Sequence, residues 1–202
     1  MRPYAIAVAA LISMAAASAC ESKAPEPAPA AIRATAIFAG GCFWCTESDF
    51  DKMPGVLATV SGYAGGRTPN PSYQQVSAGG TGHIEVVRVT YDPKRIGYAE
   101  LVRRFLPTID VVDGGGQFCD RGDSYRPAIF FANAAEKRIA EAALAAASKR
   151  LGQKTAVAVL PASRFTAAEG YHQDYYKKNP VRYKFYRWNC GRDQRLKALW
   201  QR

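Results

Sequence analysis

The chain has 202 residues, which corresponds to about one domain with a buried core and excludes a large multidomain assembly. Hydrophobic residues make up 48% and charged residues 22%, so the composition excludes a wholly disordered chain and a collagen-like repeat. The formal charge of +10 bears on partners rather than on the fold.

The first residues predict an export signal. From Tyr4 to Ala19 the chain is apolar or small, and it ends in the A-x-A cleavage pattern Ala17-Ser18-Ala19. A membrane-spanning helix needs about 20 apolar residues, so we expect residues 1–19 to be a signal peptide. Cys20 follows directly, and lipidation of Cys20, giving a membrane tether, is the alternative to simple cleavage. The sequence therefore predicts an exported protein that is either periplasmic or a membrane-anchored lipoprotein.

Residues 20–34 are rich in proline, alanine and charge and have no apolar periodicity, which is typical of a linker. The folded domain is therefore expected over residues 35–202. Within it, short apolar runs alternate with amphipathic segments. In chain order, the pattern predicts a strand at 36–39, a helix at 42–50, strands at 56–63 and 84–91, a helix at 98–106, a strand at 127–131, a helix from the N-cap Asn133 to Leu151, a strand at 155–160, and helices at 167–178 and 193–200.

Polar loops are expected between these elements, notably up to Gly82 and over residues 113–124. Strands alternating with helices, some joined by tight loops, predict a compact α/β or α+β sandwich.

The first candidate for chemistry is Cys42. Gly40 and Gly41 form a turn that places the Cys42 thiol where a helix begins, and the free N–H groups and positive helix end there favour a thiolate. The alternative is a buried structural cysteine. Cys45 lies three residues on and gives a C-x-x-C pair, and pairs on adjacent turns are more often redox-active than structural.

The second candidate is Glu85. It shares one face of its strand with Val87, Val89 and Tyr91, an otherwise apolar set. Burial there would raise the pKa of Glu85 and keep it protonated as a proton donor. The alternative is a solvated carboxylate at the end of a strand.

Five motifs occur in one order along the chain: GCFW at 41–44, GYAGG at 62–66, GHIEV at 82–86, DRG at 120–122 followed by YR at 125–126, and YHQ at 171–173 before NP at 179–180. With these motifs the chain resembles the peptide methionine sulfoxide reductases of the A type over residues 35–180. The resemblance implies a two-layer α/β (α+β) sandwich on a mixed sheet and reduction of methionine-S-sulfoxide, in proteins and as the free amino acid, without a bound cofactor.

The resemblance also implies roles for particular residues: Cys42 is the nucleophile, Phe43 and Trp44 form an apolar wall for the S-methyl group, Glu85, Tyr63 and Tyr125 donate to the sulfoxide oxygen, and Asp120 is a further acid of the binding site. These residue types suit the reaction, which needs a soft nucleophile at sulfur, a proton for oxygen and an apolar slot. Our hypothesis is that Cys42 is left as a sulfenic acid, which a second thiol converts to a disulfide.

The sequence leaves open which cysteine provides the second thiol. Many family members have glycine at the position of Cys45 and use cysteines of a glycine-rich tail instead. We favour Cys45 because its loop closure is short and local, with Cys190 as the alternative and Cys119 as a third candidate. An external dithiol reductant, such as a thioredoxin-like protein, would then reopen the disulfide.

Other features predict no further chemistry. His83 and His172 are the two histidines and the chain has one C-x-x-C pair, so we expect no metal site. The basic and aromatic tail at 181–202 is expected to be a solvated face, or to favour an anionic membrane surface, rather than to bind nucleic acid. The expected partners are oxidised proteins and a dithiol reductant, and we expect a monomer.

Two rival functions remain from the sequence. An envelope thiol–disulfide exchange protein would use Cys42 and Cys45 on protein thiols and would be indifferent to Glu85→Gln. In a non-enzymatic surface module, the cysteines would only cross-link loops, and Cys42 would be unreactive towards alkylating agents.

Overall fold

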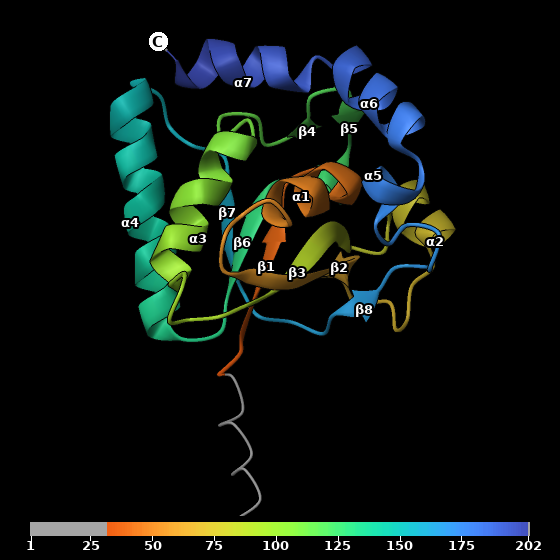
Figure 1. Ribbon diagram of the computed structural model, residues 1–202, viewed down its shortest axis with the longest axis horizontal. Coiled ribbons are helices and arrows are strands. Elements are labelled where there is room, and N and C mark those ends of the chain that lie inside the picture. The colour runs from red at the N-terminus through yellow and green to blue at the C-terminus, as the bar shows by residue number, and fades with distance from the viewer. Residues whose placement is uncertain (1–31, 202) are drawn as a thin grey trace, which may run out of the picture. The chain divides into compact units, whose positions relative to one another are not determined.

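A six-stranded sheet runs through the computed structural model, which describes residues 32–201 (Figure 1). The predicted signal peptide at 1–19, Cys20 and most of the predicted linker lie outside the described residues. The first strand begins at Ala34, one residue before the expected start of the domain. Within 32–201, no helix combines the length and apolar character that a membrane crossing requires.

The sheet has the order β7-β6-β1-β3-β2-β8. Neighbouring strands are antiparallel except β6 and β7, which are parallel and are joined through a helix, so the prediction of a mixed sheet is confirmed. A separate two-stranded hairpin pairs β4 with β5. The strands are β1 (Ala34–Ala39), β2 (Val56–Ala64), β3 (Ile84–Tyr91), β4 (Gly116–Gln117), β5 (Asp120–Arg121), β6 (Ala128–Phe131), β7 (Ala158–Pro161) and β8 (Thr166–Ala167).

Helices α1, α3 and α4 pack against the sheet, and α6 and α7 lie at the end where β1 finishes (Figure 1). Short 3-10 turns at Leu106–Thr108 and Asp123–Tyr125 complete the fold. The helices are α1 (Phe43–Phe50), α2 (Tyr73–Ala78), α3 (Tyr98–Phe105), α4 (Ala134–Leu151), α5 (Tyr175–Lys178), α6 (Pro180–Asn189) and α7 (Arg192–Trp200).

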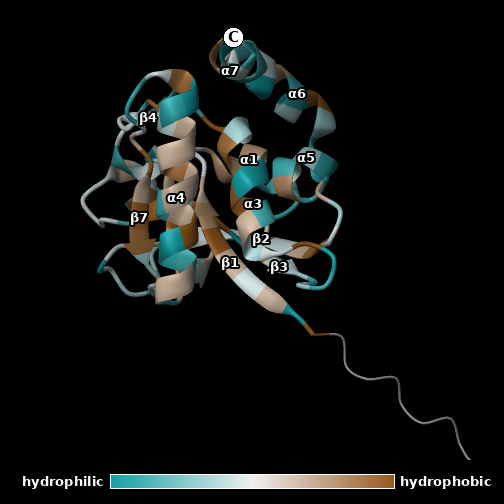
Figure 2. Cartoon of the chain, turned by 90° about the vertical axis from the view of Figure 1, so that its left-hand side faces the viewer, coloured by the Kyte–Doolittle hydropathy of each residue, from teal (hydrophilic) through white to brown (hydrophobic). Residues whose placement is uncertain are grey.

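The main core lies between one face of the sheet and these helices. Phe38 of β1 contacts Phe50 of α1 and Phe105 of α3, with ring centroids 4.8 and 5.0 Å apart. A smaller apolar cluster, including Ile84 and Phe130, lies on the opposite face. Figure 2 shows this distribution as hydrophobic colour along β1 and β7 and mixed colour along α4. The predicted two-layer sandwich is therefore confirmed.

The predicted ends of α4 are confirmed as well. The Asn133 side chain accepts hydrogen bonds from the backbone N–H groups of Ala135 and Glu136, both at 3.0 Å, and Gly152 ends the helix in the left-handed region with φ of 66°. The carboxylate of Glu136 accepts from Ala132 N–H, so it stabilises the residue before the cap rather than closing a capping box on Asn133.

Four segments differ from the prediction, and in one of them, the start of the basic tail, α6 forms where no helix is expected. The loop before Gly82 contains α2, and the loop at 113–124 contains the β4–β5 hairpin. The helix expected at 167–178 is wrong, since the segment forms β8, a loop and the single turn α5. Gln173 explains this: its side chain accepts from Ser61 N–H and donates to the Ser61 and Ala168 carbonyl groups, so the loop is fixed to β2.

Candidate active site

Two glycines place Cys42 at the end of β1. Gly41 has a φ of +78°, which favours glycine, and a Cβ there would lie 2.5 Å from Cβ of Gln117. A Cβ on Gly40 would lie 2.6 Å from Oγ1 of Thr46. The chain therefore turns sharply between strand and helix, and Cys42 becomes the N-cap residue of α1, as the sequence predicts.

Glu85 reaches the same turn from the adjacent strand. Phe43 N–H, one residue after the thiol, donates a 2.9 Å hydrogen bond to Oε2 of Glu85, whose residue is 3% exposed. Burial raises the pKa of Glu85 to about 8, and the bond from Phe43 lowers it in part. The carboxyl group is therefore protonated at neutral pH, which is the state of a proton donor.

Cys42 and Cys45 form a buried, hydrogen-bonded thiol pair. They are 6% and 2% exposed. Burial raises the pKa of Cys42, and the Cys45 thiol, Glu85 and Asp120 raise it further. The hydrogen bond with Cys42 and the charges of nearby guanidinium groups lower the pKa of Cys45 to about 7, against the effect of burial. Burial therefore disfavours a thiolate at Cys42, where the sequence predicts one, whereas the hydrogen bond with Cys42 and the nearby guanidinium groups favour a thiolate at Cys45.

Phe43 and Trp44 form a fixed aromatic wall. Trp44 Nε1 donates to Nδ1 of His172 at 3.0 Å, and its ring stacks on Tyr175 at 3.7 Å between centroids. Phe43 lies 4.9 Å from the His172 ring. Tyr186 of α6 meets Trp44 edge-on at 5.7 Å. The predicted wall residues are thus held on one side of the thiol turn by the C-terminal part of the chain.

The tyrosines near the thiol turn differ in their hydrogen-bond partners. The Tyr63 hydroxyl donates to Oε2 of Glu169 at 2.9 Å. The hydroxyl groups of Tyr73 and Tyr125 are hydrogen-bonded to each other, and both lie within the electrostatic reach of Glu85 and Cys42. Burial raises the pKa values of these two hydroxyls, which keeps them protonated. Tyr73 was missed from the sequence, although Ser72 and Gln75 form the capping box of α2 and mark its first turn.

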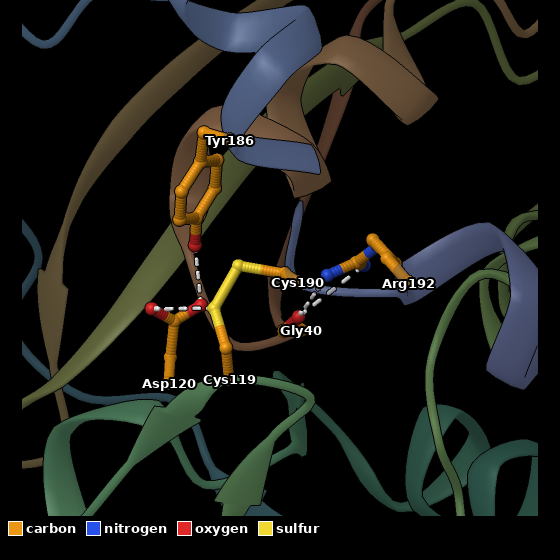
Figure 3. Close-up of a disulfide and its surroundings, with 6 residues drawn as sticks. All are labelled: Gly40, Cys119, Asp120, Tyr186, Cys190 and Arg192. Atoms are coloured by element: carbon orange, nitrogen blue, oxygen red, sulfur yellow. Dashed lines mark hydrogen bonds between the residues drawn. A yellow bond between two sulfur atoms is a disulfide. The ribbon is translucent and has the colours of Figure 1, made fainter. Parts of the chain in front are cut away.

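A disulfide between Cys119 and Cys190 lies beside this site (Figure 3). It joins the β4–β5 hairpin to the end of α6, and the Cα atoms are 4.9 Å apart. Asp120, next to Cys119, accepts a hydrogen bond from the Tyr186 hydroxyl, and burial raises its pKa. Because Cys119 and Cys190 are bonded to each other, the free thiols among residues 32–201 are Cys42 and Cys45.

Removing this disulfide is expected to lower the free energy of unfolding by about 4 kcal/mol, because it closes a loop across a sequence separation of 71 residues. Guanidinium chloride unfolding of the Cys119→Ser/Cys190→Ser double variant and of the unmodified protein, both without reductant, measures the difference. Equal unfolding midpoints and equal slopes would show that the disulfide contributes no stability.

The two histidines contact neighbouring backbone groups and aromatic rings. Nε2 of His83 is hydrogen-bonded to the Thr68 carbonyl oxygen at 2.8 Å, and its Nδ1 accepts from Gly66 N–H. His172 accepts from Trp44 and is buried among aromatic rings. Cys119, Asp120 and Cys190 come together, but the two sulfurs are bonded to each other and do not form a thiolate ligand set.

The basic tail is only partly a solvated face. Val181, Phe185 and Trp188 are exposed on the outer side of α6, whereas Arg187 Nη1 binds Asp49 at 2.9 Å and Arg192 is buried. The prediction of a solvated face is therefore wrong for Arg187 and Arg192.

Comparisons with known proteins agree with this geometry. The family model described as "Peptide methionine sulfoxide reductase" matches residues 34–202. A Rhizobium meliloti protein named peptide methionine sulfoxide reductase MsrA 2 is 52% identical over 86% of this chain and 87% of its own length. A Caulobacter vibrioides protein of the same name is 51% identical over 88% of this chain and 91% of its own.

Solved structures have the same architecture. Reduced Mxr1 from Saccharomyces cerevisiae superimposes with a TM-score of 0.71 at 32% identity, covering 75% of this chain and 88% of that one. A second structure of Mxr1, in complex with Trx2, has a TM-score of 0.50 at 22% identity and covers 75% and 90%.

Proposed function

The chain belongs to the peptide methionine sulfoxide reductases of the A type and reduces methionine-S-sulfoxide to methionine, and we propose that Cys42 is its nucleophile and Glu85 its proton donor. One observation carries this assignment. The residue after Cys42 donates its N–H to the Glu85 carboxyl group at 2.9 Å, so a buried, protonated acid lies against the thiol turn.

In the first step, Cys42 sulfur attacks the sulfoxide sulfur while Glu85 protonates the sulfoxide oxygen. A bond forms between the Cys42 sulfur and the substrate sulfur as the sulfur–oxygen bond of the substrate breaks, and the protonated oxygen leaves as water. Water then attacks the Cys42 sulfur and gives up a proton, the sulfur–sulfur bond breaks, methionine leaves, and Cys42 holds an oxygen as a sulfenic acid. Cys42 must first lose its proton, and its hydrogen bond to Cys45 provides an acceptor within the site. Oxidation of Cys42 thus balances reduction of the substrate without another electron donor.

Two further groups support this step. Tyr73 and Tyr125 are protonated and adjoin Glu85, so we assign them, with Glu85, to hydrogen bonds with the sulfoxide oxygen. Tyr63 is assigned to positioning, since its hydroxyl already donates to Glu169 and its ring lies 5.9 Å from Phe43. Phe43 and Trp44 receive the S-methyl group, which needs no hydrogen bonds.

In the second step, Cys45 attacks the Cys42 sulfenic acid and forms a disulfide. Cys45 is the free thiol next to Cys42, whereas Cys119 and Cys190 are already paired. A dithiol reductant then reopens the Cys42–Cys45 bond by exchange. We assign this part to a thioredoxin-like protein, an assignment supported by the relative Mxr1, which forms a complex with Trx2.

Mass mapping after one turnover tests the second step. With one equivalent of sulfoxide peptide and no reductant, the enzyme is expected to form one equivalent of methionine and a Cys42–Cys45 disulfide. Cys45→Ser should still form that first equivalent but should lose multiple turnover with a thioredoxin-like reductant. A Cys42–Cys190 or Cys42–Cys119 linkage would overturn the assignment of Cys45.

A thiol–disulfide exchange protein is the second candidate, supported by the hydrogen-bonded Cys42–Cys45 pair. Exchange between protein thiols requires no carboxylic acid at the attacking sulfur, so it gives no role to Glu85. Such an activity would remain after Glu85→Gln, whereas sulfoxide reduction would fall.

We also propose that the enzyme repairs exported proteins, as a monomer. The sequence at 1–19 and Cys20 support export, with either release or a lipid tether. The mass of the mature protein from cells distinguishes these outcomes: cleavage before Cys20 with added acyl mass indicates a tether, cleavage without added mass indicates release, and an intact N-terminus contradicts export by this signal.

A further inference from the structure

Arg192 is almost completely buried, although it belongs to a strongly basic segment. It is 2% exposed, and its guanidinium donates to the Gly40 carbonyl oxygen at 3.3 and 3.4 Å and to the Thr108 carbonyl oxygen at 2.7 Å. The ring of Phe118 lies 4.5 Å from the guanidinium carbon. Arg192 therefore holds the turn that carries Cys42 (Figure 3).

The charges around this guanidinium are not balanced by buried carboxylates. Asp49 pairs with Arg187 at 2.9 Å and with Arg192 at 3.8 Å, so one buried carboxylate serves two cations. Asp193 also binds Arg187, but its side chain is 68% exposed. Nε of Arg192 and Oδ2 of Asp49 lack hydrogen-bond partners. A buried cation in this position favours a further anion nearby.

Cys45 is placed to supply that anion. It lies one turn before Asp49 on α1, so the two side chains lie on the same side of the helix. The positive charges of Arg192 and Arg187 act on its thiol and favour the thiolate. The other titratable groups that interact with Cys45 are Cys42, Asp49, Glu85, Tyr183 and Tyr186.

We propose that Arg192 is a positioning residue for disulfide formation, which holds the Gly40 carbonyl group and stabilises the Cys45 thiolate, and that the Cys119–Cys190 disulfide keeps it in place. The inference deepens the proposed function and rests on the assignment of Cys45 as the second thiol.

The connection to the disulfide is short. Cys190 ends α6, Gly191 turns the chain with a φ of 64°, and Arg192 begins α7. Cys190 is tied to Cys119, and Tyr186 is tied to Asp120, both on the hairpin beside the site. These two links fix the corner between α6 and α7 from which Arg192 enters the core (Figure 3).

The step that Arg192 assists is balanced within the site. The Cys45 thiolate attacks the sulfur of the Cys42 sulfenic acid, a sulfur–sulfur bond forms, and the sulfur–oxygen bond breaks. The oxygen leaves as hydroxide and takes a proton to become water. Cys45 is oxidised, and the sulfenic sulfur of Cys42 is reduced.

The pH profile of this step tests the proposal. The reduced enzyme, mapped by mass to contain free Cys42 and Cys45 with Cys119–Cys190 intact, is mixed with one equivalent of sulfoxide peptide. Methionine and the Cys42–Cys45 disulfide are followed in quenched samples from pH 5 to 9. For Arg192→Gln, the pH at half-maximal rate of disulfide formation is expected to rise by about one unit or more. Arg192→Lys should restore the profile in part because it keeps the positive charge.

Arg195→Gln is the matched control. Arg195 lies one turn later on α7 and binds Asp110 at 2.6 Å, so this variant loses a charge and an ion pair of the same helix away from Cys45. Its pH profile should equal that of the unmodified enzyme. An unchanged profile in folded Arg192→Gln, or an equal shift in Arg195→Gln, would overturn the proposal.

A separate variant tests the role of the Cys119–Cys190 disulfide. Cys119→Ser/Cys190→Ser is expected to shift the profile in the same direction as Arg192→Gln, and the two changes together should add little. An unshifted profile in the double serine variant would overturn the role of the disulfide. Failure of the unmodified enzyme to form methionine in the first turnover would instead contradict the proposed function, so the two failures are distinguishable.

Discussion

Cys42→Ser is expected to lower methionine formation by at least about 10⁴-fold, because the hydroxyl that replaces the thiol neither attacks sulfur readily nor accepts the oxygen reversibly. The measurement is methionine released from the S epimer of a sulfoxide peptide with dithiothreitol as reductant. The R epimer should give no turnover with either protein.

The matched comparison is Cys45→Ser, which changes the same atom one turn along the same helix. It should retain the first turnover, whereas Cys42→Ser should lose it. Multiple turnover by a folded Cys42→Ser protein would exclude Cys42 as the nucleophile.

Glu85→Gln is expected to lower methionine formation by about 10²- to 10³-fold, because the amide cannot give a proton to the sulfoxide oxygen. The pKa of Glu85, about 8, also predicts how the activity changes with pH. The acid is protonated below that pH, so the activity of the unmodified enzyme should fall as the pH rises above 8. This alkaline decrease should be absent from the remaining activity of Glu85→Gln.

The thermal stability of Glu85→Gln shows whether a loss of activity results from unfolding. A carboxyl group whose pKa is raised by folding stabilises the fold at low pH and loses this contribution as the pH rises through the folded value of about 8. Glutamine does not ionise, and its carbonyl oxygen can still accept from Phe43 N–H. Glu85→Gln should therefore unfold at no lower temperature than the unmodified enzyme at pH 9. Full activity in this variant would favour thiol–disulfide exchange over the proposed mechanism.

Local patterns predicted the parts of the site that depend on neighbouring residues. The glycine pair at 40–41 predicted a turn before Cys42, and alternation along 84–91 predicted that Glu85 faces the core. Both patterns reflect backbone geometry that is decided within a few residues. The roles of Phe43 and Trp44 came instead from the resemblance to the family.

The features that the sequence patterns did not predict depend on contacts between residues far apart in the chain. Arg187 appeared to belong to a solvated basic face, but its partner Asp49 lies 138 residues earlier. Gln117 has no local signal, yet its buried side chain accepts from Asp110 N–H and donates to the Asp110 carbonyl group, and it packs against Gly41. The loop around Gln173 has the spacing of a helix but takes its hydrogen bonds from β2. No local periodicity contains this information.

The distance in sequence between Gly40 and Arg192, 152 residues, has a consequence for protein synthesis. A chain is made from its N-terminus, so β1 and the Cys42 turn emerge first, β3 brings Glu85 next, and α7 brings Arg192 last. A nascent chain thus contains the nucleophile and its acid before the buried cation that we assign to disulfide formation. The surroundings that we assign to disulfide formation are therefore complete only when the last helix has packed.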